Sequence, residues 1–125
     1  MQRNESAIKA KELMMEYLAA CDRRDFETAG RYLSDNVSYR GPTGMGSFDK
    51  AEPYLKYLER LNLPKLDIKK VFADGDDVCE FHELKFDSLS EPTFVCSWFH
   101  VDGGKISSIK VLYDPRPYLQ EKRAR

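Results

Sequence analysis

The second half of the sequence is a run of four β-strand patterns separated by short turns, which restricts the chain to few folds. We expect these strands at residues 66–73, 78–86, 93–101 and 106–113. The segment "DGGK" at 102–105 is typical of a glycine-rich hairpin turn. The prolines in "DPRPYL" exclude another central strand after it. The pattern therefore predicts an antiparallel meander.

The first half is mainly helical. Apolar residues recur every three or four positions over 6–21, which predicts a helix with one buried face. Asp25 is an expected N-cap for a second short helix, which would bury Phe26, Ala29 and Leu33. A short strand at 37–40 and a third helix at 48–61, capped by Ser47, complete this half. Helices segregated from an antiparallel sheet predict an α+β fold, with three N-terminal helices on one curved sheet.

Length and composition indicate one domain spanning residues 1–125. Charged residues make up 33% of the chain, but the net charge of −1 gives no reason to expect a nucleic-acid or membrane partner. The polar N-terminus and the absence of a membrane-length apolar run lead us to expect a cytoplasmic protein. Cys21, Cys79 and Cys96 lack the spacing of metal ligands, and we interpret them as thiols in a reducing compartment. We expect neither a metal nor a cofactor.

Three segments resemble one known superfamily when they are taken in order. They are "MEYLAACDRRDFETAGRYLSDNVSYRGPTG", "AEPYLKYLERL" and "FHVDGGKISSIKVLY". Together they resemble the nuclear-transport-factor-2-like (NTF2-like) superfamily, and within it the SnoaL-like and ketosteroid-isomerase-like proteins. The resemblance implies a cone-shaped fold with an apolar interior. That superfamily includes isomerases, dehydratases, epoxide hydrolases, polyketide cyclases and non-catalytic members, so the fold does not define the function.

The resemblance also implies which positions would carry isomerase chemistry. Tyr17 falls where ketosteroid isomerases place an oxyanion-hole tyrosine. Gly41 stands at the position of their carboxylate base, and Ser97 at the position of their protonated aspartate. Two of the three groups are therefore missing. We expect that this chain does not isomerise ketosteroids by the mechanism of those enzymes.

The strand at 78–86 offers different chemistry. Val78, Glu80, His82, Leu84 and Phe86 share one face, which the resemblance places inside the cone. Residues two apart on a strand lie about 6.5 to 7 Å from each other, so Glu80 and His82 could meet. Histidine titrates near neutral pH and is a frequent general base. The alternatives are a histidine that is only part of the core and a glutamate that points to water at the open rim.

We therefore predict a SnoaL-like protein with an apolar pocket for a small organic molecule. His82, Glu80 and Tyr17 are the expected catalytic residues of a proton-transfer reaction of isomerase, dehydratase or cyclase type. The expected pocket residues are Tyr39, Ser97, Phe86, Phe99 and Tyr113. The alternative is a non-catalytic binding or dimerisation module of the same fold.

The outward face of the strand at 93–101 predicts a partner surface. It carries Phe94, Cys96, Trp98 and His100, and the resemblance implies dimerisation through this sheet. We expect a homodimer with Trp98 near the centre of its interface. The alternative is that a C-terminal segment of the same chain, within Asp114–Arg125, covers this face.

Overall fold

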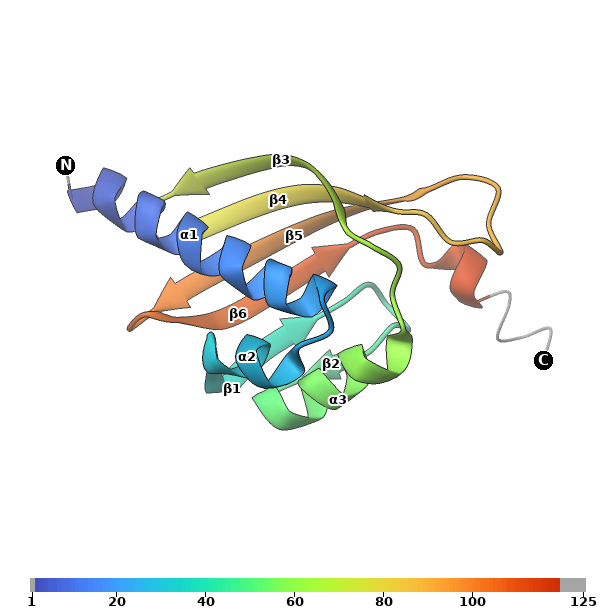
Figure 1. The fold of residues 1–125 in the computed structure, drawn as a ribbon, viewed down its shortest axis with the longest axis horizontal. Coiled ribbons are helices and arrows are strands. Elements are labelled where there is room, and N and C mark those ends of the chain that lie inside the picture. The colour runs from blue at the N-terminus through green and yellow to red at the C-terminus, as the bar shows by residue number, and fades with distance from the viewer. Residues whose placement is uncertain (1, 120–125) are drawn as a thin grey trace.

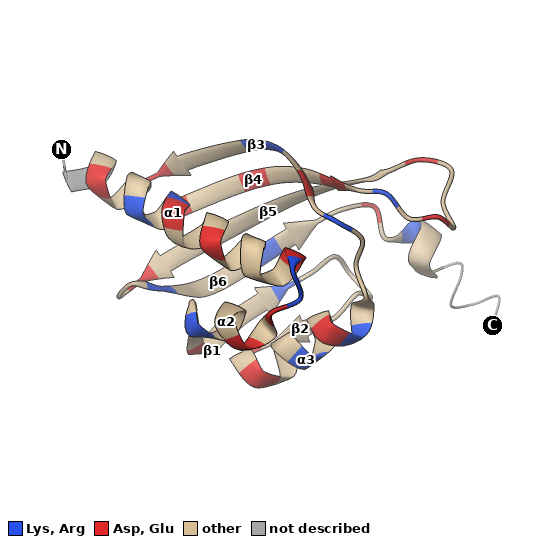
Figure 2. Ribbon diagram, in the orientation of Figure 1, with Lys and Arg blue, Asp and Glu red and all other residues tan. Residues whose placement is uncertain are grey.

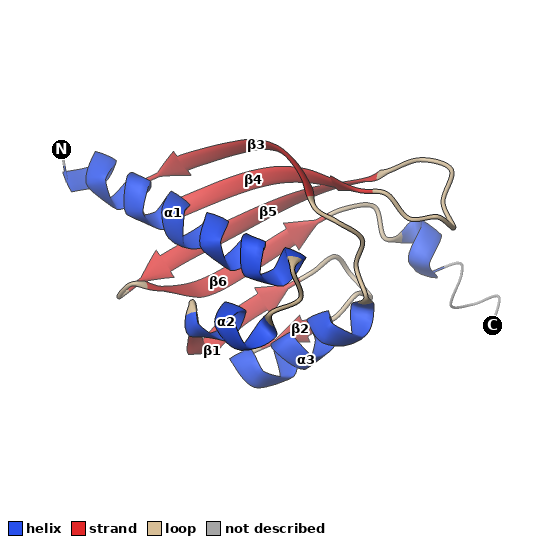
Figure 3. Cartoon of the chain, viewed as in Figure 1, coloured by secondary structure: helices blue, strands red, loops and turns tan. Residues whose placement is uncertain are grey.

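The computed structural model describes residues 2–119, in which helices cover one face of a curved six-stranded sheet (Figures 1 and 3). The helices are α1 (Gln2–Asp22), α2 (Phe26–Arg31) and α3 (Ala51–Leu61), and residues 116–119 form a further helical turn. The strands are β1 (Leu33–Arg40), β2 (Ser47–Phe48), β3 (Asp67–Asp74), β4 (Asp77–Leu84), β5 (Thr93–Asp102) and β6 (Lys105–Leu112). The predicted α+β architecture is confirmed.

The strand order is β2-β1-β6-β5-β4-β3. The meander from β3 to β6 is antiparallel throughout, as predicted. However, β1 pairs with β6 in parallel, so the whole sheet is mixed. This parallel pair forms because α3 carries the chain from one edge of the sheet to the other, and the meander then returns to β1 (Figure 1). Sequence periodicity reports faces of strands and does not report such non-local pairing.

Several element boundaries differ from the predictions, and two of these differences change the role of a residue. Leu33 is the first residue of β1 and not the end of the second helix, because its backbone pairs with Ile106. Ser47 is not a helix cap: it belongs to β2, and α3 begins later with Lys50 at its N-cap position. The predicted cap at Asp25 is confirmed, since its Oδ1 accepts a hydrogen bond from the Thr28 N–H at 3.1 Å.

The inner face of β4 is the face that the family resemblance placed inside the cone. Val78, Glu80, His82 and Leu84 are all buried, while the residues between them are half-buried. On β5, Val95, Ser97 and Phe99 are buried in the same way. Helix α1 lies across this face and adds Met14 and Tyr17 to the core. The core and the candidate site therefore share one layer between the helices and the sheet.

Basic and acidic residues are interspersed along the helices and strands (Figure 2). This distribution agrees with the nearly neutral net charge of the sequence. Within residues 2–119, no helix is both long enough and apolar enough to span a bilayer.

A hydrogen bond between two buried phenols joins α1 to α3 through the core. The hydroxyl oxygens of Tyr17 and Tyr54 lie 2.8 Å apart, and the two side chains are almost fully buried. Burial raises the pKa of both phenols well above its ordinary value. Tyr54 raises the pKa of Tyr17 further, and Cys21 raises the pKa of Tyr54 further. Both phenols therefore remain protonated in the folded protein.

We predict that this burial makes the fold sensitive to alkali. An unfolded chain loses its phenolic protons near pH 10, whereas the folded chain keeps those of Tyr17 and Tyr54. Above pH 10 the unfolded state then binds fewer protons, so stability falls as pH rises, by up to about 1.4 kcal/mol per pH unit for each phenol. Urea unfolding between pH 9 and 12 should show this slope, and the double variant Tyr17→Phe/Tyr54→Phe should reduce it by the share of these two phenols. Ionisation of all seven tyrosines near pH 10 in the folded protein would contradict the prediction.

Candidate functional site

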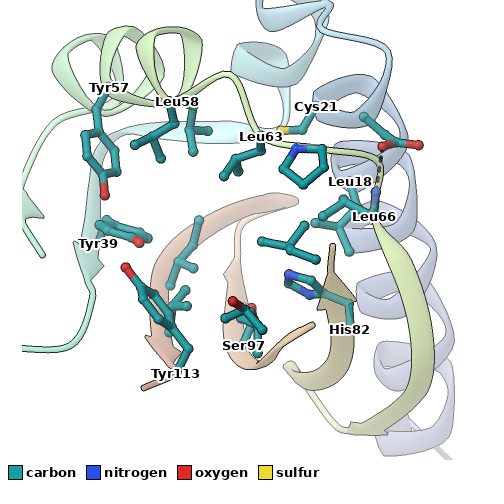
Figure 4. A pocket seen from close by; sticks show the side chains of 18 of the residues that line it. Leu18, Cys21, Tyr39, Tyr57, Leu58, Leu63, Leu66, His82, Ser97 and Tyr113 are labelled. Atoms are coloured by element: carbon teal, nitrogen blue, oxygen red, sulfur yellow. Dashed lines mark hydrogen bonds between the residues drawn. The ribbon is translucent and has the colours of Figure 1, made fainter. Parts of the chain in front are cut away.

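A cavity of about 260 Å³ lies between the inner face of the sheet and the helices (Figure 4). This is slightly below the usual range for small-molecule pockets and fits a compact organic molecule. Most of the cavity wall is apolar. Leu18 on α1, Leu58 on α3, and Val95 and Phe99 on β5 supply much of it.

Seven of the eight predicted site residues line this cavity. They are Tyr17, Tyr39, His82, Phe86, Ser97, Phe99 and Tyr113. Phe86 and Tyr113 do so from just beyond the ends of β4 and β6. Glu80 does not line the cavity, because its carboxylate lies behind the His82 ring.

Glu80 and His82 form a hydrogen-bonded pair inside the protein. The Nδ1 of His82 and the Oε1 of Glu80 lie 2.6 Å apart. Glu80 is 0% exposed and His82 is 6% exposed. The alternative interpretation of the sequence, in which Glu80 points to water at the open rim, is therefore wrong. The His82 ring projects into the cavity (Figure 4). This contact holds Nδ1 against the carboxylate and leaves Nε2 as the ring nitrogen on the cavity side.

The second carboxylate oxygen of Glu80 lacks a comparable hydrogen bond within the described residues. Its Oε2 is buried and has no hydrogen-bond partner among the described residues. A buried carboxylate is costly unless it is paired. His82 is therefore the group that stabilises Glu80, and Glu80 in turn fixes the orientation of the imidazole, as a carboxylate behind a catalytic or metal-binding histidine does.

The other predicted polar groups are placed differently. The Tyr17 hydroxyl is bonded to Tyr54, and the Tyr17 ring packs edge-on against Phe99. Ser97 pairs with Glu80 across β4 and β5, and its side chain is buried at the cavity wall. Ser97 has no side-chain hydrogen bond to the rest of residues 2–119. It is thus a donor or acceptor that a cavity molecule could use.

Three further phenols meet at the end of the cavity away from His82: those of Tyr39 on β1, Tyr57 on α3 and Tyr113 (Figure 4). The Tyr57 hydroxyl donates to the Met45 carbonyl at 3.0 Å. Burial raises the pKa of all three phenols. Neighbouring tyrosines raise the pKa of Tyr39 and of Tyr113 further. At neutral pH all three are hydrogen-bond donors and none is a base.

The prediction missed Tyr54, Tyr57, Cys21 and Tyr118 as cavity residues. Tyr54 and Tyr57 lie three residues apart on α3, a spacing that places them on one helix face. That signal is present in the sequence, but it is equally typical of core packing. Burial raises the pKa of the Cys21 thiol to about 11, so this thiol is protonated at neutral pH and is a poor nucleophile.

The space around Gly41 is tight for the carboxylate that the resemblance implies at this position. A Cβ at this position would lie 3.3 Å from the Tyr39 hydroxyl and 3.5 Å from the Gly46 carbonyl oxygen. A carboxylate side chain at position 41 would therefore crowd the Tyr39 phenol. The end of the cavity where the resemblance implies a base holds a phenol donor in this chain.

The second histidine lies on the opposite side of the sheet, as predicted. His100 Nδ1 lies 2.9 Å from Asp77 Oδ1, and the Trp98 indole N–H donates to the same carboxylate oxygen. Across the described residues, no three histidine, cysteine or carboxylate side chains are grouped as metal ligands.

Comparison with known proteins places this geometry in a family. The SnoaL-like domain family matches residues 15–109. No curated protein matches the chain significantly. Among solved structures, a nuclear-transport-factor-2-like protein of unknown function from Cytophaga hutchinsonii is 27% identical, with a TM-score of 0.79 over 88% of this chain and 94% of that one.

Two more distant structures share the fold. An epoxide hydrolase of M. tuberculosis, described as LEH-like, is 23% identical, with a TM-score of 0.74 over 91% of this chain and 89% of that one. A candidate ketosteroid isomerase from Kribbella flavida is 18% identical, with a TM-score of 0.77 over 87% and 80% of the two chains. These likenesses confirm the predicted cone-shaped fold, and the family match covers most of the sequence. The chain belongs to the SnoaL-like domain family, within the nuclear-transport-factor-2-like superfamily.

Proposed function

We propose that this protein binds a small, mostly apolar, uncharged organic molecule in its cavity and catalyses a proton transfer on it. His82 is the general base, and Glu80 positions it. The reaction class is abstraction of a proton activated by a carbonyl group, as in isomerisation, dehydration or aldol-type cyclisation. No bound cofactor is required for this chemistry, because the proton acceptor and the carboxylate that positions it are both side chains of this chain.

The observation that carries this proposal is the buried contact of 2.6 Å between Glu80 and His82, with the imidazole projecting into the cavity. A base that is desolvated, oriented and adjacent to a substrate-sized space meets the geometric needs of proton abstraction. In the tautomer that donates Nδ1–H to Glu80, Nε2 of His82 carries the free electron pair that accepts the proton. The carboxylate stabilises the imidazolium that forms.

Tyr17 and Ser97 have supporting roles in this proposal. Ser97 lies on the strand next to His82, and its buried hydroxyl can donate to an oxygen of the substrate. Tyr17 is bonded to Tyr54, so its phenol fixes the wall of the cavity between α1 and α3. Phe86 and Phe99 provide apolar contact.

A non-catalytic binding protein is the second candidate function. It is favoured by the absence of a carboxylate at Gly41 and Ser97, the positions where the resemblance implies isomerase carboxylates. In that case the pair of His82 and Glu80 would orient a ligand without transferring a proton. Both candidates share the cavity and differ only in the chemistry at Nε2.

We further propose that the protein works in a reducing compartment such as the cytoplasm. Cys21, Cys79 and Cys96 are all free thiols. Protein thiols persist where glutathione and thioredoxin keep them reduced.

The proton-transfer proposal predicts deuterium exchange from D₂O into small cyclic ketones and conjugated enones. The wild-type protein should accelerate exchange of at least one such compound at neutral pH, as followed by proton NMR. Glu80→Gln should lower that rate about 100-fold, within the range of general acid–base contributions. The double variant His82→Phe/Glu80→Leu should abolish the acceleration but remain folded, because it removes both partners of the buried pair.

His100→Phe is the matched control, since His100 also contacts a carboxylate but faces outward. Its exchange rate should equal that of the wild type. Binding of these compounds without any accelerated exchange would reject catalysis and favour the binding protein. Equal loss of exchange in His100→Phe would show that the assay does not report on the cavity.

We also propose a homodimer that forms through the outer face of the sheet. The outer-face patch consists of Phe72, Phe94, Trp98 and Leu112, whose exposed fractions range from 45% to 68%. Phe81 stacks on Phe94 and meets Phe72 edge-on, so the aromatic surface crosses β3, β4 and β5. Residues 114–119 leave this patch uncovered, because Tyr118 packs on Phe86 and Tyr113 at the end of the cavity. An apolar surface of this kind favours a second copy of the chain.

Light scattering at micromolar concentration should give the mass of a dimer, and Trp98→Glu should give the mass of a monomer. The reason is that one buried, unpaired carboxylate on each chain opposes association. Ile8→Glu is the control, since Ile8 is 59% exposed on α1, away from the outer-face patch. A monomeric wild type, or an unchanged mass in Trp98→Glu, would reject this interface.

A further inference from the structure

The cavity has a second polar end that the proton-transfer proposal does not use. Figure 4 shows the hydroxyl groups of Tyr39, Tyr57 and Tyr113 on one side of the cavity and the His82 ring on the other. The rings of Tyr39 and Tyr57 are 6.1 Å apart, and the three phenols are close enough to influence one another electrostatically. These three groups come from β1, α3 and the end of β6, so the fold itself brings them together.

We infer that Tyr39, Tyr57 and Tyr113 form a donor subsite that binds a second uncharged acceptor oxygen of the ligand, such as a ketone carbonyl. This oxygen lies at the end of the ligand away from His82 and is distinct from the carbonyl that activates the proton His82 abstracts. This inference deepens the proposed function, on whose cavity and ligand it rests. Tyr57 holds the subsite in place, since its own proton is donated to the Met45 carbonyl. Tyr39 and Tyr113 supply the donors, because neither hydroxyl is hydrogen-bonded to any described residue.

The charge pattern of the lining selects a neutral oxygen. Among the lining residues, only Asp22, Arg24 and His82 have side chains that carry or can gain a charge at neutral pH. His82 lies across the cavity from the phenols (Figure 4), and Asp22 accepts a hydrogen bond from the Leu66 N–H at 2.9 Å. One nitrogen of the Arg24 guanidinium donates a hydrogen bond to the Glu59 carbonyl at 2.7 Å. A carboxylate placed among the three phenols would lose its hydration without gaining a counter-charge. Phenols that remain protonated can donate to a carbonyl without such a cost.

The register of the sheet sets the length of the ligand. His82 pairs with Val95, and continuing the pairing of Leu112 with Cys96 by one residue places Tyr113 beside Val95. Two strand spacings therefore separate the backbones of His82 and Tyr113, or roughly 10 Å. Both side chains line the cavity, on opposite sides of it (Figure 4). The ligand that fits is a compact molecule of one or two rings with its acceptor oxygen at one end.

The subsite can be tested with two compounds that differ in one oxygen. The probes are 1-tetralone and tetralin, which are bicyclic and differ in the ketone group. Calorimetry on the wild type should show at least tenfold tighter binding of 1-tetralone. Tyr39→Phe and Tyr113→Phe should each weaken 1-tetralone binding about 5- to 10-fold and leave tetralin binding unchanged.

Gly41→Ala provides an independent test, because its added methyl group would crowd the Tyr39 hydroxyl at 3.3 Å without removing it. It should weaken 1-tetralone binding in the same way as Tyr39→Phe. Tyr32→Phe is the control, since Tyr32 is not a lining residue. It should bind both compounds like the wild type.

Four other results would reject the subsite, and one of them would also reject the proposed function. Equal affinity of the wild type for the two compounds, or full 1-tetralone affinity in Tyr39→Phe and Tyr113→Phe, would reject the subsite but keep the cavity. If Ser97→Ala alone lowered 1-tetralone affinity, the acceptor oxygen would lie beside His82 and the inference would be wrong. If neither compound bound the wild type, both the subsite and the proposed function in this size class would fail.

Discussion

The contact between Glu80 and His82 constrains the rest of the structure. A carboxylate with no exposed surface needs a charge-assisted partner, and the strand places His82 two residues away on the same face. Because β4 lies between β3 and β5, its backbone groups are paired on both sides and its side chains have little freedom. The helices therefore cover a polar pair as well as the apolar face of the sheet. The cavity is the space between the helices and the sheet beside this pair.

The same arrangement divides the cavity chemically. One end offers an imidazole nitrogen that can accept a proton, and the other offers phenols that donate hydrogen bonds. The wall between them is mostly apolar, so a bound molecule is oriented by its two ends and desolvated along its length. A carboxylate at position 41 would lie beside the Tyr39 phenol, so Gly41 is what leaves this end a donor site.

Local patterns in the sequence predicted much of this fold. The alternation in β4 and β5 grouped the residues of each face correctly, because a period of two directly reports the side of a sheet. The family resemblance then identified the inner face, including Ser97 and both members of the buried pair. The cap at Asp25 was also predictable, since its reason is local. The parallel pairing of β1 with β6 was not, because it depends on where α3 returns the chain.

The candidate site was predictable to a similar extent and for the same reason. Residues on one strand face, such as His82 and Glu80, could be grouped from the sequence alone. The meeting of Tyr57 with Tyr39 and Tyr113 could not be foreseen, because it joins a helix to two strands far apart in the chain. The position of Glu80 behind the imidazole, and not on the cavity wall, likewise follows from packing under the helices and not from periodicity.

The protonation state of His82 tests the central claim most directly. The chain has two histidines, so nitrogen-15 NMR can resolve the four ring nitrogens, with His100 as an internal reference. We predict the tautomer in which Nδ1 of His82 carries the proton donated to Glu80 and Nε2 carries none. A cavity-binding ketone should then shift Nε2 of His82 and leave His100 unchanged. A proton on Nε2, with Nδ1 accepting from a protonated Glu80, would contradict the account, because His82 could not then act as a base toward the cavity.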